Sequence, residues 1–487
     1  MRVLVLNGSP KGKYSITLQT LLYLEKKFPE HKFQYLHAGQ RIKSLEKDFS
    51  AATEAVASAD LVIFSYPVYT FIAPSQLHRF IELLKASSLD VSGKFVTQVT
   101  TSKHFYDVTA HNYIQENCQD LGMKYIKGLS ADMDDLLTES GRQCAEEFFR
   151  YVCWCMKHDI YETIPVFTKA LIPAHLPVSP ISSGQGGGQG EKQDGGQGEE
   201  REKAQFRHQD KAQGKDQDKG KRAGDVVIVT DCAKDDKQLN DMINRFRAVL
   251  KYKSRVINIS EYPFHGGCLG CFNCAADGKC IYKDGFDGFL RSHIQSADAI
   301  VYAFSIKDHS MGSIIKMYDD RQFCNGHRTV TMGKPVGYLV SGNYPSEANL
   351  QVIIEARSEV GGNFLAGVAC DQVNPDAEID KLAARLEYAI DHKYVQPRNF
   401  YGVGGMKIFR DLIWVMRGLM KADHRFYKKH GLYDFPQKKR WTILKMHLVG
   451  ALMSSPRLKA KMGNKMNEGM IAPYKKVLEE NVIRGRG

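Results

Sequence analysis

Two distant parts of this chain carry closely similar runs of residues. SADLVIFSY at 58–66 is matched by SADAIVYAF at 296–304, and GKFVTQVTT at 93–101 is matched by GKPVGYLVS at 333–341. The first run of the chain, RVLVLNG, is likewise similar to DVVIVTD at 225–231. Repetition of this kind predicts one folding unit that occurs twice. The offset is 223 residues at the first pair of runs and 238 at the pair near 58, so the second copy carries 15 additional residues in between.

Short apolar runs alternate with amphipathic stretches in the first copy. We expect strands at 2–6, 32–36, 60–66, 94–100 and 124–129, and helices near 15–28, 48–58, 74–86, 109–121 and 139–158. Several strands are apolar almost without interruption, which is typical of a parallel sheet covered by helices on both faces. The alternation predicts a doubly wound α/β fold, either flavodoxin-like or Rossmann-like.

A polar stretch separates the two copies. Residues 179–223 are rich in Gly, Gln, Lys and Asp, and their only large apolar side chains are Ile181 and Phe206. Such a segment buries too little apolar surface to offset the entropy of ordering, so we expect a disordered tether. The predicted organisation is a first domain at 1–178, the linker, a second domain at 224–396 and a helical tail at 397–487.

The net charge of +12 is concentrated in the tail. Residues 397–487 hold 20 Lys and Arg against 6 Asp and Glu, whereas the rest of the chain is close to neutral. This distribution excludes nucleic-acid binding by the protein as a whole. Apolar residues at helical spacing in 406–421 and 438–453 predict helices that pack on the second domain or across a dimer. A basic helix on a membrane surface is the less favoured alternative.

The cysteines and the absence of a leader-like segment bear on localisation. The chain has 11 cysteines, and the only apolar stretch at its start, 3–6, is far shorter than a secretory core. These features favour reduced thiols and a cytoplasmic protein. No apolar run is long enough for a membrane-spanning helix.

Hydroxyl side chains follow the first predicted strand. The loop at 7–17 reads NGSPKGKYSIT and leads into a helix, where backbone N–H groups and the helix dipole attract anions. Ser9, Ser15 and Thr17 can each donate a hydrogen bond to a phosphate. An ordinary turn with a serine at the helix start is an equally good interpretation of this loop alone.

A second loop favours a binding site. The third predicted strand runs into YPVYTFIAP at 66–74, and in a flavodoxin-like strand order this loop lies beside the first. Proline and aromatic side chains suit a flat heteroaromatic ring. The two loops together therefore predict a site for a flavin mononucleotide.

These loops, GSPKGKYSIT and PVYTFIAPSQLHRFIELL, resemble those of the NAD(P)H-dependent FMN reductases of the flavodoxin superfamily, over roughly residues 1–165. The resemblance implies two flavodoxin-like doubly wound parallel sheets of strand order 2-1-3-4-5, one in each copy. It also implies FMN as cofactor and NAD(P)H as electron donor. The residues that it assigns to FMN binding are Ser9, Lys11, Ser15, Ile16 and Thr17 in the first loop, Pro67, Val68, Tyr69, Thr70 and Phe71 in the second, and Thr101 and Ser102 after the fourth strand.

Four cysteines lie in the additional residues of the second copy. Cys268, Cys271, Cys274 and Cys280 are spaced C-x2-C-x2-C-x5-C in a glycine-rich segment. Thiolates this dense suit an iron–sulfur cluster or zinc, and a plain loop of reduced cysteines is the alternative. The block resembles the cysteine loop of the iron–sulfur flavoproteins, relatives of the FMN reductases. This resemblance implies a [4Fe–4S] cluster on the four cysteines.

The second copy lacks the flavin-loop features of the first. Its first loop contains Asp235 and Asp236 where a phosphate would lie, and its third-strand loop, SIKDHSMG at 305–312, has no Pro-x-Tyr. These departures disfavour a second FMN. Asp308 and His309 in the same loop are interpreted as surface hydrogen-bonding residues rather than as a proton relay.

The predicted function is an FMN-dependent oxidoreductase that passes electrons from NAD(P)H to a flavin, a quinone or a similar small molecule, with the cluster as a second redox centre. No acid–base residue is assigned. Two alternatives stay open: a non-enzymatic electron carrier of flavodoxin type, and an interaction scaffold with a degenerate second copy. We further expect a homo-oligomer and no nucleic-acid partner.

Overall fold

The computed structural model of the protein describes residues 1–163, 221–372, 374–454 and 457. Residues 1–425 form one compact unit and residues 426–487 another. The first unit contains two α/β domains, called here the first domain (1–163) and the second domain (221–392). The predicted linker at 179–223 lies outside the described residues except for its last three.

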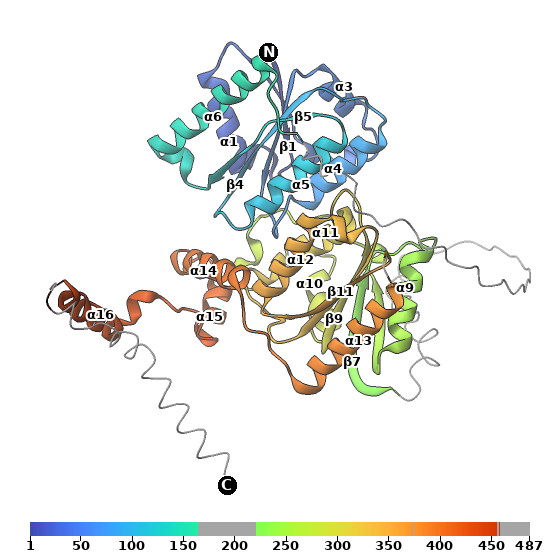
Figure 1. The fold of residues 1–487 in the computed structure, drawn as a ribbon. Helices are drawn as coiled ribbons and strands as arrows, with labels where there is room; N and C mark the ends of the chain where they lie inside the picture. The colour runs from blue at the N-terminus through green and yellow to red at the C-terminus, as the bar shows by residue number, and fades with distance from the viewer. Residues whose placement is uncertain (164–220, 373, 455–456, 458–487) are drawn as a thin grey trace, which may run out of the picture. The chain divides into compact units, whose positions relative to one another are not determined.

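The first domain is built on a parallel sheet (Figure 1). Its strands are β1 (Arg2–Asn7), β2 (Lys32–Leu36), β3 (Leu61–Pro67), β4 (Phe95–Ser102), β5 (Lys124–Tyr125) and β6 (Leu129–Asp132). The order is β2-β1-β3-β4-β5, and β6 pairs with β4. This is the predicted order. The fifth expected strand, 124–129, is divided into β5 and β6. Gly128 between them packs so closely on Gln98 that no side chain fits there.

Helices cover both faces of this sheet. α1 (Ile16–Lys27) and α6 (Glu139–His158) bury leucine, phenylalanine and valine side chains against one face. The other helices of the domain are α2 (Ala38–Leu45), α3 (Ser50–Ser58), α4 (Ser75–Ala86) and α5 (Asp107–Asp120). Of these six helices, only α2 was not predicted.

The second domain repeats the architecture. Its strands are β7 (Arg222–Thr230), β8 (Tyr252–Asn258), β9 (Ala299–Ser305), β10 (Pro335–Ser341) and β11 (Phe364–Cys370), in the order β8-β7-β9-β10-β11. All pairs are parallel. The prediction of two flavodoxin-like sheets of order 2-1-3-4-5 is therefore confirmed. The first strand begins at Arg222, two residues before the predicted domain boundary.

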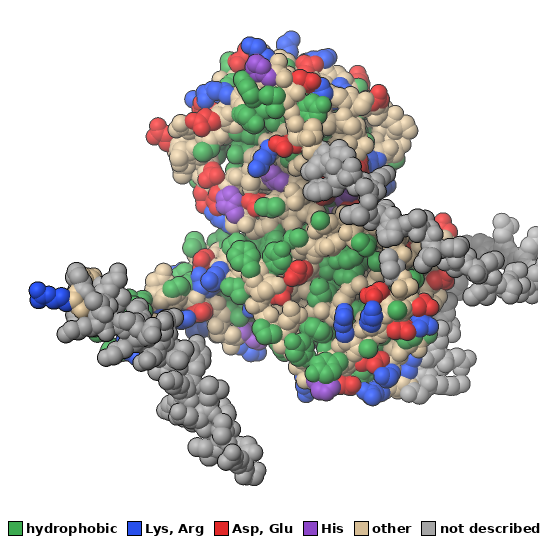
Figure 2. Space-filling view, in the orientation of Figure 1, with side chains coloured by type: hydrophobic (Ala, Val, Ile, Leu, Met, Phe, Trp, Pro, Cys, Tyr) green, Lys and Arg blue, Asp and Glu red, His purple; other side chains and the backbone are tan. Residues whose placement is uncertain are grey.

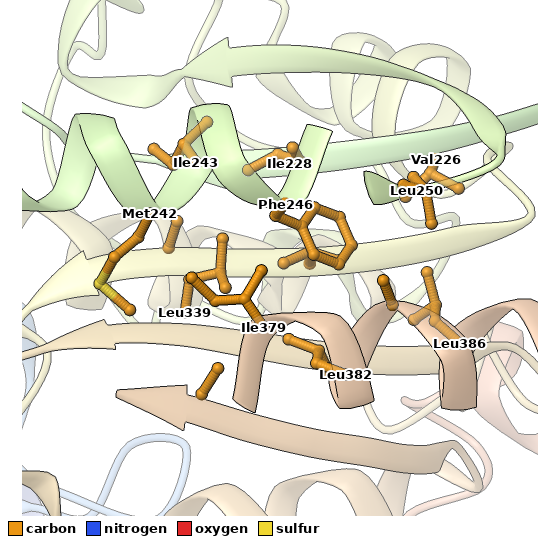
Figure 3. Packing of buried hydrophobic residues seen from close by; sticks show 14 of the residues in the cluster. Val226, Ile228, Met242, Ile243, Phe246, Leu250, Leu339, Ile379, Leu382 and Leu386 are labelled. Carbon is orange, nitrogen blue, oxygen red and sulfur yellow. The ribbon is translucent and has the colours of Figure 1, made fainter. Parts of the chain in front are cut away.

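One face of the second sheet carries the core shown in Figure 3. α9 (Lys237–Val249) contributes Met242, Ile243 and Phe246, and α13 (Pro375–His392) contributes Ile379, Leu382 and Leu386. These side chains converge on strand residues such as Ile228 and Leu339. The remaining helices of the domain are α10 (Phe286–Phe289), α11 (Gly312–Arg321) and α12 (Ala348–Gly361).

The two domains meet through corresponding helices. α4 packs against α11, and α5 packs against α12. α4 and α11 each follow the third strand of their own sheet, and α5 and α12 each follow the fourth. This pairing places loops of the second domain beside the carboxyl ends of β1 and β3, where a doubly wound sheet binds its ligands.

Three further helices follow α13. They are α14 (Phe400–Val415), which packs against α12, α15 (Lys421–Lys429) and α16 (Arg440–Met453). The helix predicted at 406–421 ends at Val415, and the break before α15 contains Gly418, a poor helix former. None of the helices in the described ranges is long and apolar enough to span a bilayer. On the face drawn in Figure 2, basic and acidic side chains are intermixed over the first domain.

Candidate functional site

One cavity brings the predicted site residues together. Its volume is about 580 Å³, and it is lined by all twelve residues predicted to bind FMN and by all four cysteines of the second domain. The lining comes from the loops after β1, β3 and β4, from the cysteine loop between β8 and β9, from residues 322–331, and from helices that include 348–361 and 400–415. The site thus lies between the two domains of the first unit.

The loop after β1 contains a buried hydroxyl with no partner. Ser15 is the residue before α1, and its side chain makes no capping hydrogen bond to that helix. Its Oγ is buried and has no hydrogen-bond partner among the described residues. Thr17 Oγ1 lies 2.6 Å from Thr101 Oγ1, and the Ser9 hydroxyl accepts a hydrogen bond from the backbone N–H of Lys11. An unpartnered buried hydroxyl at a helix N-terminus fits an oxyanion such as a phosphate.

In the second domain, the corresponding loop, which follows β7, is filled by the side chain of Asp236. Asp236 precedes α9 and accepts a hydrogen bond from the backbone N–H of Leu239 at 3.1 Å. Its other carboxylate oxygen accepts a hydrogen bond from Ser305 Oγ at 2.6 Å. Burial raises the pKa of nearby Asp231 to about 6. A phosphate here would meet carboxylates rather than free donors, which agrees with the prediction of no second FMN.

The loop after β3 forms a strained turn. Thr70 and Phe71 have positive φ angles of 44° and 72°, which non-glycine residues adopt only when the surroundings impose them. The turn is closed by two backbone hydrogen bonds between Tyr69 and Ile72, at 2.8 and 3.1 Å. The Phe71 ring packs against Phe105, with 5.0 Å between ring centroids. This wall of the cavity is therefore aromatic and rigidly held.

The second domain has the same turn with different side chains. Asp308 and His309, each 238 positions after Thr70 and Phe71, also have positive φ angles, and Lys307 and Ser310 close the turn. His309 does not pair with Asp308: its ring nitrogens lie 2.9 Å from the carboxylates of Asp120 and Glu347. Neither residue lines the cavity. Both residues take part in the contact between the domains, since Asp308 also pairs with Lys85 at 2.9 Å, so the interpretation as surface hydrogen-bonding residues is wrong.

Two charged residues of α11 hold the turn after β3 and were not predicted. Lys316 is fully buried and donates a 3.0 Å hydrogen bond to the backbone carbonyl of Tyr69. It forms an ion pair with Asp320, also fully buried, whose carboxylate accepts a 2.7 Å hydrogen bond from the backbone N–H of Ser75. Burial lowers the pKa of Lys316 and raises the pKa of Asp320. The opposite charge of the partner partly offsets each of these two shifts. The second domain thereby positions the turn of the first.

The cysteine loop lies directly on the predicted flavin loops. Gly270 has a φ angle of +59°. A side chain at this position would collide with the Tyr69 hydroxyl and crowd the Lys11 side chain. Gln76 donates a 3.2 Å hydrogen bond to the carbonyl of Cys268. Lys11 Nζ lies over the ring of Phe272, 5.3 Å from its centroid. The cysteine loop of one domain therefore covers the predicted flavin site of the other.

The four thiols share the cavity but are not preorganised around a metal ion. Cys274 Sγ donates to the carbonyl of Phe323, and Cys280 Sγ accepts from Arg321 at 3.8 Å. Burial raises the pKa of Cys274 to about 11 and that of Cys268 further. Across the described ranges, no three His, Cys, Asp or Glu side chains are grouped so that they could hold a metal ion. The arrangement therefore offers no preformed single-ion site.

Two other parts of the cavity lining were not predicted from the sequence. One is Arg321, which is fully buried, is paired with Asp284 at 2.8 Å and contacts Cys280 of the cysteine loop. α14 and the segment after it supply an apolar wall, which consists of Ile408, Phe409, Leu412, Met416, Leu419 and Met420. This apolar wall lies beside the aromatic turn, because the Phe409 ring stacks on Phe105, with 4.3 Å between ring centroids, and Phe105 packs against Phe71.

The first domain is similar in sequence to a known family. Residues 1–132 match the model of the NADPH-dependent FMN reductases. This span ends with β6 and includes the three loops of the first domain that line the cavity. No curated protein matches the chain.

Solved structures resemble the chain only distantly. An NAD(P)H:quinone oxidoreductase from Methanothermobacter marburgensis is 11% identical, with 34% of this chain and 98% of that chain covered and a TM-score of 0.26. General stress protein 14 from Treponema denticola, in complex with FMN, is 13% identical, with 32% and 98% covered and a TM-score of 0.25. At sequence identities and TM-scores this low, the resemblance to these two structures carries no argument about the activity of this chain.

Proposed function

We propose that the protein is an NAD(P)H-dependent FMN oxidoreductase with its flavin in the first domain. The observation that carries this proposal is the buried hydroxyl of Ser15 in the loop after β1, which has no hydrogen-bond partner in the part of the chain that the structure describes. The family match over residues 1–132 supports it, because it covers that loop and the aromatic turn. The cavity is large enough to accept a flavin ring beside these loops.

Each part of the site would have a distinct task. Ser15, with the N–H groups at the start of α1, would hold the phosphate, and the turn of Tyr69 to Phe71 would border the ring. When bound, FMN supplies the hydride and electron chemistry. Lys316 and Asp320 keep the turn in its strained conformation by binding the Tyr69 carbonyl and the Ser75 N–H. The cysteine loop covers the site and restricts the entry of water.

The acceptor proposed is a small molecule such as a free flavin or a quinone. The apolar wall supplied by α14 gives the apolar part of such a molecule a surface to pack against. The [4Fe–4S] cluster stays a prediction from the cysteine spacing. Since no ion site is preformed, we derive no electron step through the cluster.

We further infer that the two domains arose by duplication. Both have strand order 2-1-3-4-5, and both contain the same positive-φ turn after the third strand. The interface contacts are also reciprocal: Ser75 binds Asp320, and Ser313 binds Glu82, with 238 positions between the corresponding residues.

The proposed function is tested by anaerobic reduction of the FMN-loaded protein. NADH or NADPH is expected to bleach the flavin absorbance, and added quinone or free flavin is expected to restore it with turnover. Reduction by dithionite but not by either nicotinamide would instead support an electron carrier. Failure to bind FMN at all would contradict the proposal and leave the scaffold alternative.

A further inference from the structure

Arg321, the last residue of α11, binds the cysteine loop on both sides of its four cysteines. Its Nη1 donates a 2.9 Å hydrogen bond to the carbonyl of Gly266, which precedes the first cysteine. Nη1 and Nη2 each donate a 2.8 Å hydrogen bond to the carboxylate of Asp284, which follows the last cysteine. Nη2 also donates to Cys280 Sγ at 3.8 Å. One guanidinium therefore joins the start of the loop to its end.

Aromatic rings enclose this ion pair. The guanidinium carbon lies 4.6, 5.2 and 5.5 Å from the ring centroids of Tyr282, Phe286 and Phe264. The side chains of Arg321 and Asp284 are each 1% exposed. Ring faces attract a cation, and a bidentate bond from arginine to a carboxylate is strong and fixed in direction. Since Tyr282 and Phe264 flank the cysteines, the enclosure is complete only while the loop lies against α11.

The start of the cysteine loop also lies against the first domain. Gly267 packs on α4, where an added Cβ would come within 2.7 Å of the side chains of Ser75 and Gln76. The backbone N–H of Ser75 is bound by Asp320, the neighbour of Arg321 in α11. α11 thus binds the start of α4 through Asp320 and the cysteine loop through Arg321. Both walls of the site are fixed to one helix.

We propose that Arg321 is a positioning residue that holds the cysteine loop closed over the flavin site. The inference rests on the proposed function, since it takes FMN to lie beneath this loop. Two other contacts hold the loop at one position each: Gln76 binds Cys268, and Cys274 binds Phe323. Arg321 instead joins two positions that lie 18 residues apart, at 266 and 284. Without that contact the loop would open away from the first domain, and FMN would leave more easily.

The test compares the exposure of the loop with the release of FMN in the full-length, FMN-loaded protein. Arg321→Met with Asp284→Asn removes both charges together, so that no unpaired charge stays buried and the protein should still fold. We expect the backbone amides of residues 264–284 to exchange hydrogen for deuterium roughly tenfold faster than in the parent, the scale for loss of charge-assisted hydrogen bonds. FMN should dissociate faster by a similar factor, followed by the fluorescence of the released flavin.

Two further variants make the test specific. Arg321→Lys keeps a buried cation but not the planar fork, so both rates should lie between those of the parent and the double variant, and it provides the comparison if the double variant does not fold. Arg245→Met with Asp380→Asn removes a bidentate pair between α9 and α13, away from the cavity, and should change neither rate.

The possible failures are distinguishable. A parent that binds no FMN would overturn the proposed function and this inference with it. A parent that binds FMN overturns only the role of Arg321 if loop exchange in its variants is unchanged, or if exchange is faster while FMN leaves no faster.

Discussion

The backbone N–H of Ser75 donates a 2.7 Å hydrogen bond to the carboxylate of Asp320, although the two residues belong to different domains and lie 245 positions apart. A reciprocal hydrogen bond of 2.8 Å runs from the N–H of Ser313 to Glu82. The interface is therefore close to symmetric in its contacts but not in its chemistry. Only Asp320 is paired with a buried lysine, and that lysine, Lys316, binds the turn at the predicted flavin site.

Removal of the Asp320 carboxylate should destabilise the protein strongly. Asp320→Ala leaves Lys316 buried with Asp319, 3.7 Å away, as its nearest acidic neighbour. We expect the free energy of unfolding in urea to fall by about 3 kcal/mol, because the buried lysine loses its closest partner and the Ser75 N–H loses its acceptor. The matched change, Glu82→Ala, removes a partly exposed carboxylate and should cost only about 1 kcal/mol, as for a lost helix cap. Equal losses would show that the buried lysine is not the cause.

The protein should bind one FMN per chain rather than two. The loop after β1 has the unpartnered hydroxyl of Ser15, whereas the loop after β7 is filled by the carboxylate of Asp236. The measurement is the ratio of flavin to protein after reconstitution with excess FMN and removal of the free cofactor. A ratio near two would contradict the assignment of the second domain as flavin-free.

Ser15→Ala should weaken FMN binding. A hydrogen bond to a charged group contributes about 1.5–3 kcal/mol, so the dissociation constant should rise by roughly tenfold to a hundredfold. Isothermal titration of the apoprotein measures it. Ser44→Ala, which changes an exposed serine on α2, is the control. If both variants bind FMN as tightly as the parent, the phosphate lies elsewhere.

The strands, the helices and the first-domain loops could be predicted because their signals are local, whereas the strand order was implied by the family resemblance. Apolar runs alternate with amphipathic stretches, and the hydroxyls of Ser9, Ser15 and Thr17 sit within one short loop. The paired domains then bring this loop, the aromatic turn and the cysteine loop to one cavity. Nothing in the local pattern showed that the second domain would cover the site of the first.

Lys316 and Asp320 were missed for a physical reason. A charged residue in an amphipathic pattern ordinarily faces solvent, and both lie in GSIIKMYDDR, which has charges typical of a surface helix. Their burial results from the packing of α11 on α4, a contact between segments more than 200 residues apart. The apolar wall from α14 was missed likewise, because its position depends on packing against α12.

The contact around His309 should make stability depend on pH. Hydrogen bonds to the carboxylates of Asp120 and Glu347 raise the pKa of His309 to about 10, from 6.5. Lys85 also pairs with Asp120, and burial raises the pKa of neighbouring Glu116 to about 7. Because the folded-state pKa of His309 is raised, its stabilisation is complete below pH 6.5 and is lost as the pH rises through about 10.

The difference in free energy of unfolding between the parent and His309→Gln should therefore shrink over that pH range. Urea denaturation at a series of pH values measures it. His158→Gln, on the exposed side of α6, should give a small difference without this trend. A His309→Gln difference that is constant with pH would show that the imidazole carries no charge in this contact.

The cysteine loop should bind iron and sulfide when the protein is prepared anaerobically. The prediction rests on the C-x2-C-x2-C-x5-C spacing and on the presence of all four thiols in one cavity. A four-iron cluster holds its thiolates farther apart than a single ion does, so the absence of a preformed ion site in the described ranges counts more against zinc than against a cluster.

The measurement is iron, acid-labile sulfide and zinc per chain, in the parent, in Cys274→Ala and in Cys144→Ala. Cys144 is exposed on α6 and away from the cavity, so its loss should leave the metal content unchanged. Cys274→Ala should lower iron and sulfide together, since it removes one ligand. The raised pKa of Cys274, about 11, means that ligation must displace a proton, so binding should strengthen as the pH rises from neutral. Near-stoichiometric zinc, or neither iron nor sulfide in the parent, would exclude the cluster and leave the loop as a cover over the site of the first domain.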